Sequence, residues 1–306
     1  MKAQQICVVI PAINEEGTIG KIVSQACACG YKVIVVDDGS TDDSLAFARS
    51  IDDPRVRVIS DGLNKGLPAR LNEIVQEAKY DLIARMDADD LLPPSRISQQ
   101  VEFLLNRPEI DLVTTGLLSM DDSKHLVGIR KPDVSEGDNI NLNNLINGRC
   151  FVAHATIVSR KSWSLRNPYD ESAKLMEDYQ LWIDSFLKND FHLGFIGDPL
   201  YYYRESSSVS KEKSVIAYLN QLELVKSRYK DKLGGKLFVK FLIRMKLKIL
   251  VVRFLHLLGK VDFLLRLRSE SGVDLGCYLQ EFNTNVDLID KLALPQSFIE
   301  VSDYDC

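Results

Sequence analysis

Short apolar runs alternate with amphipathic segments along the first two hundred residues of the chain. Apolar runs rich in β-branched residues predict buried strands at residues 6–11, 32–36, 56–60, 82–86 and 111–116. Apolar positions at helical spacing predict helices between them, at residues 16–29, 67–78 and 95–105, with a further capped helix that ends near residue 49. This alternation predicts an α/β fold with a mostly parallel sheet and helices on both faces.

The pattern changes after residue 116. Strand-like segments at 125–130, 155–159, 191–196 and 200–204 and a helical segment at 178–188 continue the mixed character. Residues 137–148, rich in asparagine, predict a loop or a weak helix. From about residue 211 the spacing is helical. The sequence therefore predicts a domain over residues 1–210 and a helical C-terminal appendage over residues 211–306.

Polar residues gather after the first four predicted strands, and in parallel sheets ligands bind beyond these carboxyl ends. The four polar stretches are residues 11–16, 37–40, 64–66 and 87–90. Asp87, Asp89 and Asp90 carry the clearest chemistry, because carboxylates two residues apart can hold one Mg²⁺ or Mn²⁺ that also binds substrate phosphates. A capped, solvated turn is the alternative, but the place at a strand end favours the metal.

The other two loops offer groups for a nucleotide. Asp37 or Asp38 can accept hydrogen bonds from a ribose hydroxyl or a base N–H, and Gly39 allows a close backbone approach, although either acid can also cap a helix. Lys65 and Arg70 lie near a helix start and suit a pyrophosphate, with an ordinary solvated loop as the alternative.

Three residues later in the chain are candidates for the acceptor side. Glu177 and Asp178 open a predicted helix, where acids commonly act as caps; Asp178 could instead deprotonate an acceptor hydroxyl. His154 is either a core histidine or a residue that positions the acceptor.

Five stretches resemble, in order and spacing, the family 2 glycosyltransferases of GT-A fold, over roughly residues 5–210. The first three are Val8-Val9-Ile10-Pro11-Ala12-Ile13-Asn14-Glu15, Val35-Val36-Asp37-Asp38-Gly39-Ser40-Thr41-Asp42 and Asn64-Lys65-Gly66 through Ala69-Arg70-Leu71-Asn72. The last two are Ala84-Arg85-Met86-Asp87-Ala88-Asp89-Asp90 and Glu177-Asp178-Tyr179-Gln180-Leu181-Trp182. Pro94-x-Arg96 with Gln100 and His154-Ala155-Thr156 are further similar pieces.

The resemblance implies a Rossmann-like GT-A domain that transfers a sugar, with inversion, from a UDP- or GDP-linked donor to a glycan or lipid-linked acceptor in surface-polysaccharide assembly. It implies that Asp87 and Asp89 bind the divalent metal, Mn²⁺ or Mg²⁺, and that Asp178 is the catalytic base. The nucleotide pocket would be lined by Pro11, Glu15, Asp37 and Asp38. Many relatives also carry an Arg-x-His signature after the last strand. Here Glu205 and Ser206 follow Arg204, which removes that histidine.

The segment 236–268 mixes apolar residues with nine basic residues and one acid, Asp262. Such a segment can lie on an anionic membrane surface, or pack on the protein or on a second copy as an ordinary amphipathic appendage. Oligomeric state stays open. With no signal peptide or spanning segment evident, we expect a cytoplasmic protein, peripheral on the inner membrane face.

Several function classes are disfavoured. The net charge of -5 argues against nucleic-acid binding. No GxGxxG follows a strand, which argues against a dehydrogenase. A nucleotidyltransferase is expected to have a Gly- and Arg-containing loop where this chain has residues 11–16. The six cysteines favour buried free thiols over disulfides in a chain of this length. A non-catalytic module that binds sugar nucleotides or polysaccharide remains the alternative to an enzyme.

Overall fold

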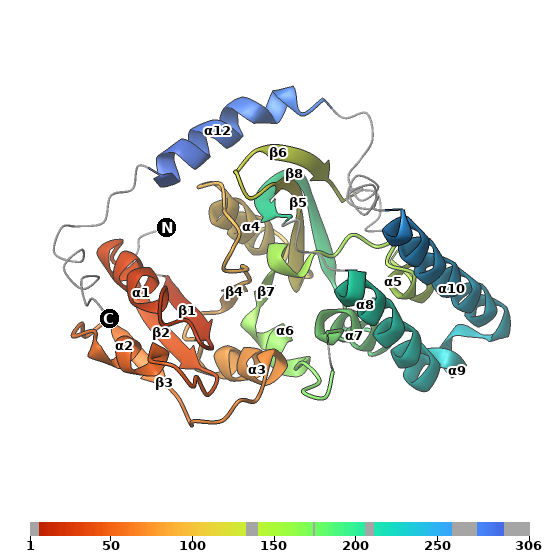
Figure 1. Ribbon diagram of the computed structural model, residues 1–306, viewed down its shortest axis with the longest axis horizontal. Coiled ribbons are helices and arrows are strands. Elements are labelled where there is room, and N and C mark those ends of the chain that lie inside the picture. Colours follow the sequence, from red (N-terminus) through yellow and green to blue (C-terminus); the bar gives the residue numbers. More distant parts are fainter. Residues whose placement is uncertain (1–5, 133–139, 174, 206–210, 259–273, 291–306) are drawn as a thin grey trace.

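The computed structural model describes residues 6–132, 140–173, 175–205, 211–258 and 274–290. The N-terminal part is a parallel sheet of β1 (Cys7–Ala12), β2 (Lys32–Asp37) and β3 (Val56–Ile59), with β2 in the middle (Figure 1). Side chains alternate along β2, so Val33 and Val35 pack with α1 (Ile19–Ala28) and α2 (Ser44–Ser50). Ile34 and Val36 pack with α3 (Leu67–Glu77) on the other face.

A second, five-stranded sheet is mixed. Its path runs from β4 (Leu82–Ala84) through β7 (Val158–Arg160) and β5 (Leu112–Met120) to β6 (Leu126–Arg130). The twelve-residue strand β8 (Leu193–Arg204) pairs in parallel with β5, while β7 is antiparallel to both β4 and β5. The helix α4 (Arg96–Leu105) contributes Leu104 to a cluster with Val113 and Val158 of this sheet.

The predicted α/β class, with a parallel sheet and a helical C-terminal region, is confirmed, and the first four strands begin where the pattern placed them or one residue later. The second sheet differs from a parallel one because β7 is inserted antiparallel between β4 and β5. The two strands expected at 191–196 and 200–204 are the single strand β8, which follows β5 across register shifts near Gly116. The segment expected as a strand at 155–159 begins with the 3₁₀ turn η3 (His154–Thr156).

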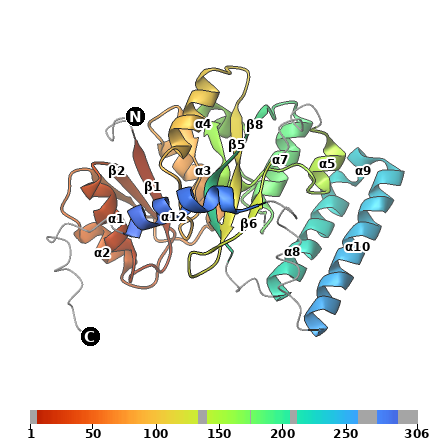
Figure 2. The same cartoon turned by 90° about the horizontal axis from the view of Figure 1, so that it is seen from above.

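The helices that follow β6 pack largely through one hydrophobic cluster. These elements are α5 (Leu142–Ile146), α6 (Lys161–Arg166), α7 (Glu177–Leu187), α8 (Lys211–Leu224), the π-helical turn η4 (Val225–Tyr229), α9 (Lys230–Leu233), α10 (Gly235–Leu257) and α12 (Gly276–Asp290). Trp182 of α7 and Phe241 of α10 belong to the same cluster. The helices α8 and α10 lie together at one end of the molecule (Figures 1 and 2). Phe282 of α12 is buried against Tyr202 of β8, with ring centroids 4.9 Å apart.

The cysteines agree only in part with the expectation of buried free thiols. Among the described residues, the cysteines Cys7, Cys27, Cys29, Cys150 and Cys277 are all free thiols, as expected. Cys29 and Cys277 are exposed, however, which differs from the expected burial. No helix in the described ranges is long and apolar enough to cross a bilayer.

Candidate active site

The loops that follow β1 and β2 are joined by hydrogen bonds. The N–H of Asn14 donates to Ser40 Oγ (3.0 Å), and the N–H of Thr41 donates to Asn14 Oδ1 (2.9 Å). Asn14 has a positive φ of 53°, a conformation that asparagine tolerates better than most residues. Pro11 and Glu15 are exposed at this edge of the sheet, as the strand-end rule predicts.

Asp37 is a buried, ionised acceptor at the end of β2. Its side chain accepts from Ser60 Oγ (2.8 Å) and from the Ser40 N–H (3.3 Å). Burial alone would raise the pKa of Asp37, but the hydrogen bonds from Ser40 and Ser60 outweigh burial and hold the pKa below its ordinary value. The structure therefore keeps a carboxylate at this strand end across the physiological pH range.

Gly39 brings two loops into contact. Its φ is +72°, and a Cβ at this position would lie 2.7 Å from the backbone nitrogen of Asn64. Any side chain would be strained by the backbone and would also push the 63–64 segment away. The turn after β2 is thereby fixed against the loop that leads into α3.

Asp38 holds that second loop in place. Its carboxylate accepts from the N–H groups of Lys65 (2.7 Å) and Gly66 (3.1 Å) and from Arg70 Nε (2.8 Å). The buried Arg70 also reaches Asp61 and Glu73, and these carboxylates raise its pKa further despite burial. Lys65 Nζ pairs with the same two acids. Asp38, Lys65 and Arg70 are thus mutually engaged, which gives the loop before α3 a defined shape.

The acidic loop after β4 is anchored by a tyrosine from β8. The Asp87 N–H donates to Tyr201 Oη (3.0 Å), and Tyr201 Oη donates to Asp90 Oδ2 (2.6 Å). The Arg204 N–H donates to the other oxygen of Asp90 (2.7 Å). Burial raises the pKa of Asp90 to about 6, against these two hydrogen bonds. Asp89 is exposed and Asp87 half-buried, so the two residues predicted as metal ligands face solvent while Asp90 is internal.

Arg85 connects this loop to the acceptor-side candidates. Its guanidinium pairs with Asp87 at 2.6 Å, and its positive charge acts on both Asp178 and His154. His154 Nε2 lies 2.7 Å from Tyr169 Oη. Burial, aided by Arg85, lowers the pKa of His154 to about 3, so the imidazole is neutral at physiological pH. Arg85 is thus ion-paired with Asp87, and its charge also reaches His154 and Asp178.

Asp178 and Glu177 form the first turn of α7. Burial raises the pKa of Asp178, and the charge of Glu177 adds to the rise, against the Tyr179 N–H and Arg85. Because the folded-state pKa exceeds the unfolded one, the folded state holds the proton more tightly. Stability is therefore lost as pH rises between the two values. Above the unfolded-state pKa, the raised pKa of Asp178 is therefore a local cost to the fold.

Two buried polar residues support the site from behind. Arg96 Nη2 donates to the carbonyls of Arg85 (2.8 Å) and Ala155 (3.0 Å), and its guanidinium lies 4.8 Å from the centre of the Tyr201 ring. Gln100 Nε2 donates to the carbonyl of Thr156 (2.8 Å). These contacts fix the end of β4 against the η3 turn that carries His154.

Sequence reasoning missed the roles of Arg85, Asp90 and Tyr201. The third aspartate of the acidic loop was visible, but its partner stands 111 residues later in the chain. Tyr201 begins a Tyr-Tyr-Tyr run, and its alternation only showed that neighbouring rings point to opposite faces. A buried tyrosine hydroxyl usually has a hydrogen-bond partner, so a buried Tyr201 would predict a partner without identifying which residue it is.

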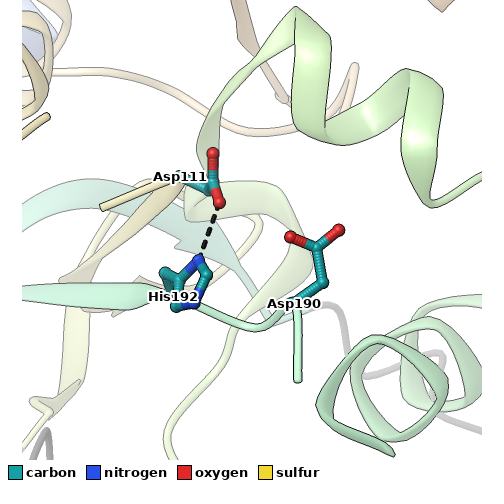
Figure 3. A group of neighbouring side chains, drawn as sticks. All are labelled: Asp111, Asp190 and His192. Carbon is teal, nitrogen blue, oxygen red and sulfur yellow. Dashed lines mark hydrogen bonds and ion pairs between the residues drawn. The ribbon is translucent and has the colours of Figure 1, made fainter. Parts of the chain in front are cut away.

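A second acidic group lies at the opposite edge of the mixed sheet. Asp111, Asp190 and His192 place one ligand atom each within 4.8 Å of one another, just before β5 and β8 begin (Figure 3). Arg166 already pairs with both carboxylates, at 3.2 and 2.9 Å, and Asn167 donates to Asp190. The strands β4 and β5 run in the same direction. Asp111 precedes β5, whereas Asp87 and Asp89 follow β4, so this group and the acidic loop lie at opposite ends of the strands.

A cavity of about 380 Å³ lies beside α7 and is lined by residues including Tyr169, Asp170 and Asp184. Three of its charged groups are paired with one another, because Arg228 contacts Asp170 at 3.2 Å and Asp184 at 2.6 Å. Glu177 and Asp178 do not line it. The chemistry of the strand-end loops is thus separate from this cavity.

Comparison with known proteins identifies a family. A family model described as "Glycosyl transferase family 2" matches residues 7–163, about half of the chain. EpsE of Bacillus subtilis, a protein named as a glycosyltransferase, is 29% identical over 235 residues, which cover 72% of this chain and 80% of EpsE. WfaP of Escherichia coli is 27% identical over 237 residues, covering 72% of this chain and 86% of WfaP. Its name describes a UDP-Glc:alpha-D-GlcNAc-diphosphoundecaprenol beta-1,3-glucosyltransferase.

One solved structure has the same fold. It is a mannosyltransferase from Pyrobaculum calidifontis in complex with GDP-Man and Mn²⁺, similar with a TM-score of 0.53 over 97% of this chain and 82% of that one. Sequence identity is 13%, so this likeness concerns the fold, and it confirms the predicted GT-A class.

Proposed function

The chain belongs to glycosyl transferase family 2, and from this premise we propose that it moves a sugar with inversion from a UDP- or GDP-linked donor to a glycan or lipid-linked acceptor. One observation carries the proposal. Arg85 pairs with Asp87 of the acidic loop and also acts on Asp178, so a diphosphate-binding loop and a general base would flank one bond-breaking centre. Surface-polysaccharide assembly is the process that this activity would serve.

The donor set suits a divalent metal. Asp89 is exposed and Asp87 is half-buried, and their carboxylates are the oxygen ligands that Mg²⁺ and Mn²⁺ prefer. Bound there, the cation would neutralise charge on the departing diphosphate. The group formed by Asp111, Asp190 and His192 suits the donor's metal less, because it lies where β5 and β8 begin, whereas Asp37, Asp38 and the acidic loop lie at the carboxyl ends of β2 and β4.

Asp178 is proposed to take the proton from the acceptor hydroxyl. The raised pKa makes its carboxylate a better proton acceptor than the carboxylate of an exposed aspartate. His154, neutral and tied to Tyr169, is proposed to position the acceptor, since it cannot supply positive charge. Glu177 raises the pKa of Asp178 further by its negative charge.

The nucleotide is proposed to lie on the edge formed by Pro11, Glu15 and Asp37, with Asp38, Lys65 and Arg70 shaping the adjoining loop. Asp37 keeps its charge, as an acceptor for ribose or base donors requires. The Pyrobaculum calidifontis structure holds GDP-Man and the name of WfaP specifies UDP-Glc, so relatives support both nucleotides. The name of WfaP also specifies a diphosphoundecaprenol-linked acceptor, which supports a lipid-linked acceptor here.

A thermal-shift screen tests the donor site. UDP-, GDP-, CMP- and dTDP-sugars would each be added with Mn²⁺, with Mg²⁺ or with EDTA. A donor at a hundred times its dissociation constant stabilises the fold by about 2.7 kcal/mol, a shift of roughly 5–10 °C. We expect the shift with one nucleotide class, lost in EDTA and in Asp89→Ala and kept in Asp178→Asn. Absence of any shift in folded protein would contradict the donor site and would instead favour a non-catalytic module that binds polysaccharide.

A further inference from the structure

The helix α10 has two apolar faces, of which the protein covers one. Phe241, Met245, Ile249 and Val252 are buried at helical spacing, against the main hydrophobic cluster and against Val215 of α8. An ordinary amphipathic helix would present polar residues on the opposite face. Here that face also carries large apolar side chains.

The outward face is a continuous stripe. Its members are spaced three or four residues apart and are Val239, Ile243, Leu247, Leu250, Phe254 and Leu257. Ile243 and Leu250 are each 63% exposed, and Leu257 is 80% exposed. Single exposed apolar residues are ordinary, but a stripe along about five turns of helix marks a contact surface. We call these six residues the outer stripe.

Basic residues border the outer stripe. Lys240 lies on one side of it by helical spacing, Lys246 and Arg253 lie on the other, and all three are exposed. The helix contains no acidic residue between Gly235 and Leu257. Arg244 and Lys248 turn toward the protein, the first donating to Asn147 Oδ1 at 3.1 Å and the second lying over the Tyr218 ring.

We propose that the outer stripe of α10 docks on the surface of an anionic lipid bilayer, with the helix lying in the plane of the interface. Apolar side chains would enter the acyl boundary, and Lys240, Lys246 and Arg253 would reach lipid phosphates. The helix does not qualify as a membrane span, which fits an in-plane position. The basic residues 260, 266 and 268 of the predicted membrane segment lie outside the described residues.

Charge selects lipid over a second copy of this chain. A two-fold contact through the outer stripe would bring the basic border of each copy against the same border of the other, and like charges would repel. An anionic surface instead complements Lys240, Lys246 and Arg253, which border the outer stripe. The position of α10 at one end of the molecule leaves the stripe accessible to a flat surface (Figures 1 and 2).

Docking would also hold the part of the protein that carries Asp178 beside the membrane. The buried face of α10 shares a hydrophobic cluster with Leu181 and Trp182 of α7, the helix that begins with Glu177 and Asp178. A lipid-linked acceptor would then meet the site at the bilayer surface, and this consequence rests on the proposed function. The docking itself does not, because it depends only on the outer stripe and its basic border.

Co-sedimentation of the full chain with vesicles tests the proposal. Vesicles of phosphatidylcholine mixed with phosphatidylglycerol are compared with vesicles of phosphatidylcholine alone. We expect binding to the anionic vesicles that weakens with salt. The double variant Ile243→Glu, Leu250→Glu should lose it by more than tenfold. Removing Lys240, Lys246 and Arg253 together, as glutamines, should weaken binding roughly fivefold per residue.

Matched control variants distinguish an effect at the outer stripe from a general effect of changing surface charge. Leu105→Glu changes a residue of α4 that is 68% exposed, and should leave vesicle binding intact. The triple variant Lys21→Gln, Arg49→Gln, Lys79→Gln removes the same net charge from exposed residues elsewhere, and should also bind. Thermal shift with donor should be unchanged in all these variants, so a failure of docking is distinguishable from a failure of the donor site.

Three results would overturn the proposal. One is the absence of binding to anionic vesicles by the wild-type chain, and another is equal loss of binding in the control triple variant. The third is a dimer, measured by light scattering, that Ile243→Glu, Leu250→Glu dissociates without any change in vesicle binding. That result would assign the outer stripe to a contact between copies.

Discussion

The hydroxyl of Tyr201 ties together the two ends of the acidic loop, and Tyr201→Phe removes only that hydroxyl. In the wild type it accepts from the Asp87 N–H at 3.0 Å and donates to Asp90 Oδ2 at 2.6 Å. Burial raises the pKa of Tyr201, so the hydroxyl keeps its proton and remains a donor. The substitution leaves one donor and one charged acceptor without this partner.

The expected magnitude follows from these two groups. An unsatisfied buried donor or acceptor costs about 1–3 kcal/mol, and the Asp90 carboxylate keeps its second hydrogen bond from the Arg204 N–H. We therefore expect the free energy of unfolding to fall by about 2 kcal/mol. The rate of sugar transfer should fall by more than the loss of folded protein explains. A displaced loop misplaces Asp87, and a shift of about 1 Å at a reacting centre can cost a hundredfold in rate.

The matched control is Tyr202→Phe. Tyr202 is the next residue of β8, is also buried, and its hydroxyl accepts from Asn285 Nδ2 at 2.7 Å, on the face that packs against α12. This variant should lose similar stability and keep nearly wild-type transfer. The assay follows release of the nucleoside diphosphate and reports kcat and KM separately.

The kinetics and stabilities of the two variants distinguish a positioning role of Tyr201 from a purely structural one. If both variants lose equal stability and both keep wild-type kcat and KM, Tyr201 has no positioning role. If Tyr201→Phe lowers kcat at saturating donor while its unfolding free energy matches that of Tyr202→Phe, the loop is positioned by this hydroxyl. Urea denaturation supplies the stability comparison, and an unchanged m-value shows that the denatured states are equivalent.

Asp178→Asn should reduce kcat by 10²- to 10⁴-fold at unchanged donor affinity, and wild-type transfer should fall as pH drops through the raised pKa of Asp178. The same variant should raise the melting temperature at pH 7 but not near pH 3, and a lower value at pH 7 would contradict the stability argument. Gly39→Ala should cost about 1–3 kcal/mol in urea denaturation, because its φ is positive and its Cβ would lie 2.7 Å from Asn64 N; a neutral effect would mean that the loop adapts. His192→Ala should keep the metal-dependent thermal shift with donor, whereas Asp89→Ala should lose it, and the reverse outcome would move the metal to the opposite edge of the sheet.

Local patterns in the chain were sufficient for most elements of the first sheet. β-Branched runs with helical spacing between them located β1, β2 and β3, and the run is fully apolar from Val33 to Val36 because the central strand β2 is buried on both faces. The strand-end rule then predicted that Pro11, Glu15, Asp37 and Asp38 lie at one edge of the sheet. Such inferences succeed because each depends on neighbours within a few residues.

Pairing in the second sheet could not be read in the same way. The three-residue strand β7 lies antiparallel between β4 and β5, and nothing in its short apolar pattern specifies a direction. Likewise, the continuity of β8 across Pro199 depends on its register against β5, which shifts near Gly116. Strand order and direction are set by contacts between residues far apart in sequence, and a period-two pattern is the same in either orientation.

The sequence alone thus determined the α/β class, the family resemblance and the acids that could carry chemistry, because residue type and local spacing encode them. Three features became visible only in the folded protein: Asp90 is internal and held by Tyr201, Arg85 pairs with Asp87, and α10 leaves a second apolar face uncovered. The physical reason is that charge, burial and exposure depend on everything packed around a group. Those neighbours are brought together by folding from distant parts of the chain.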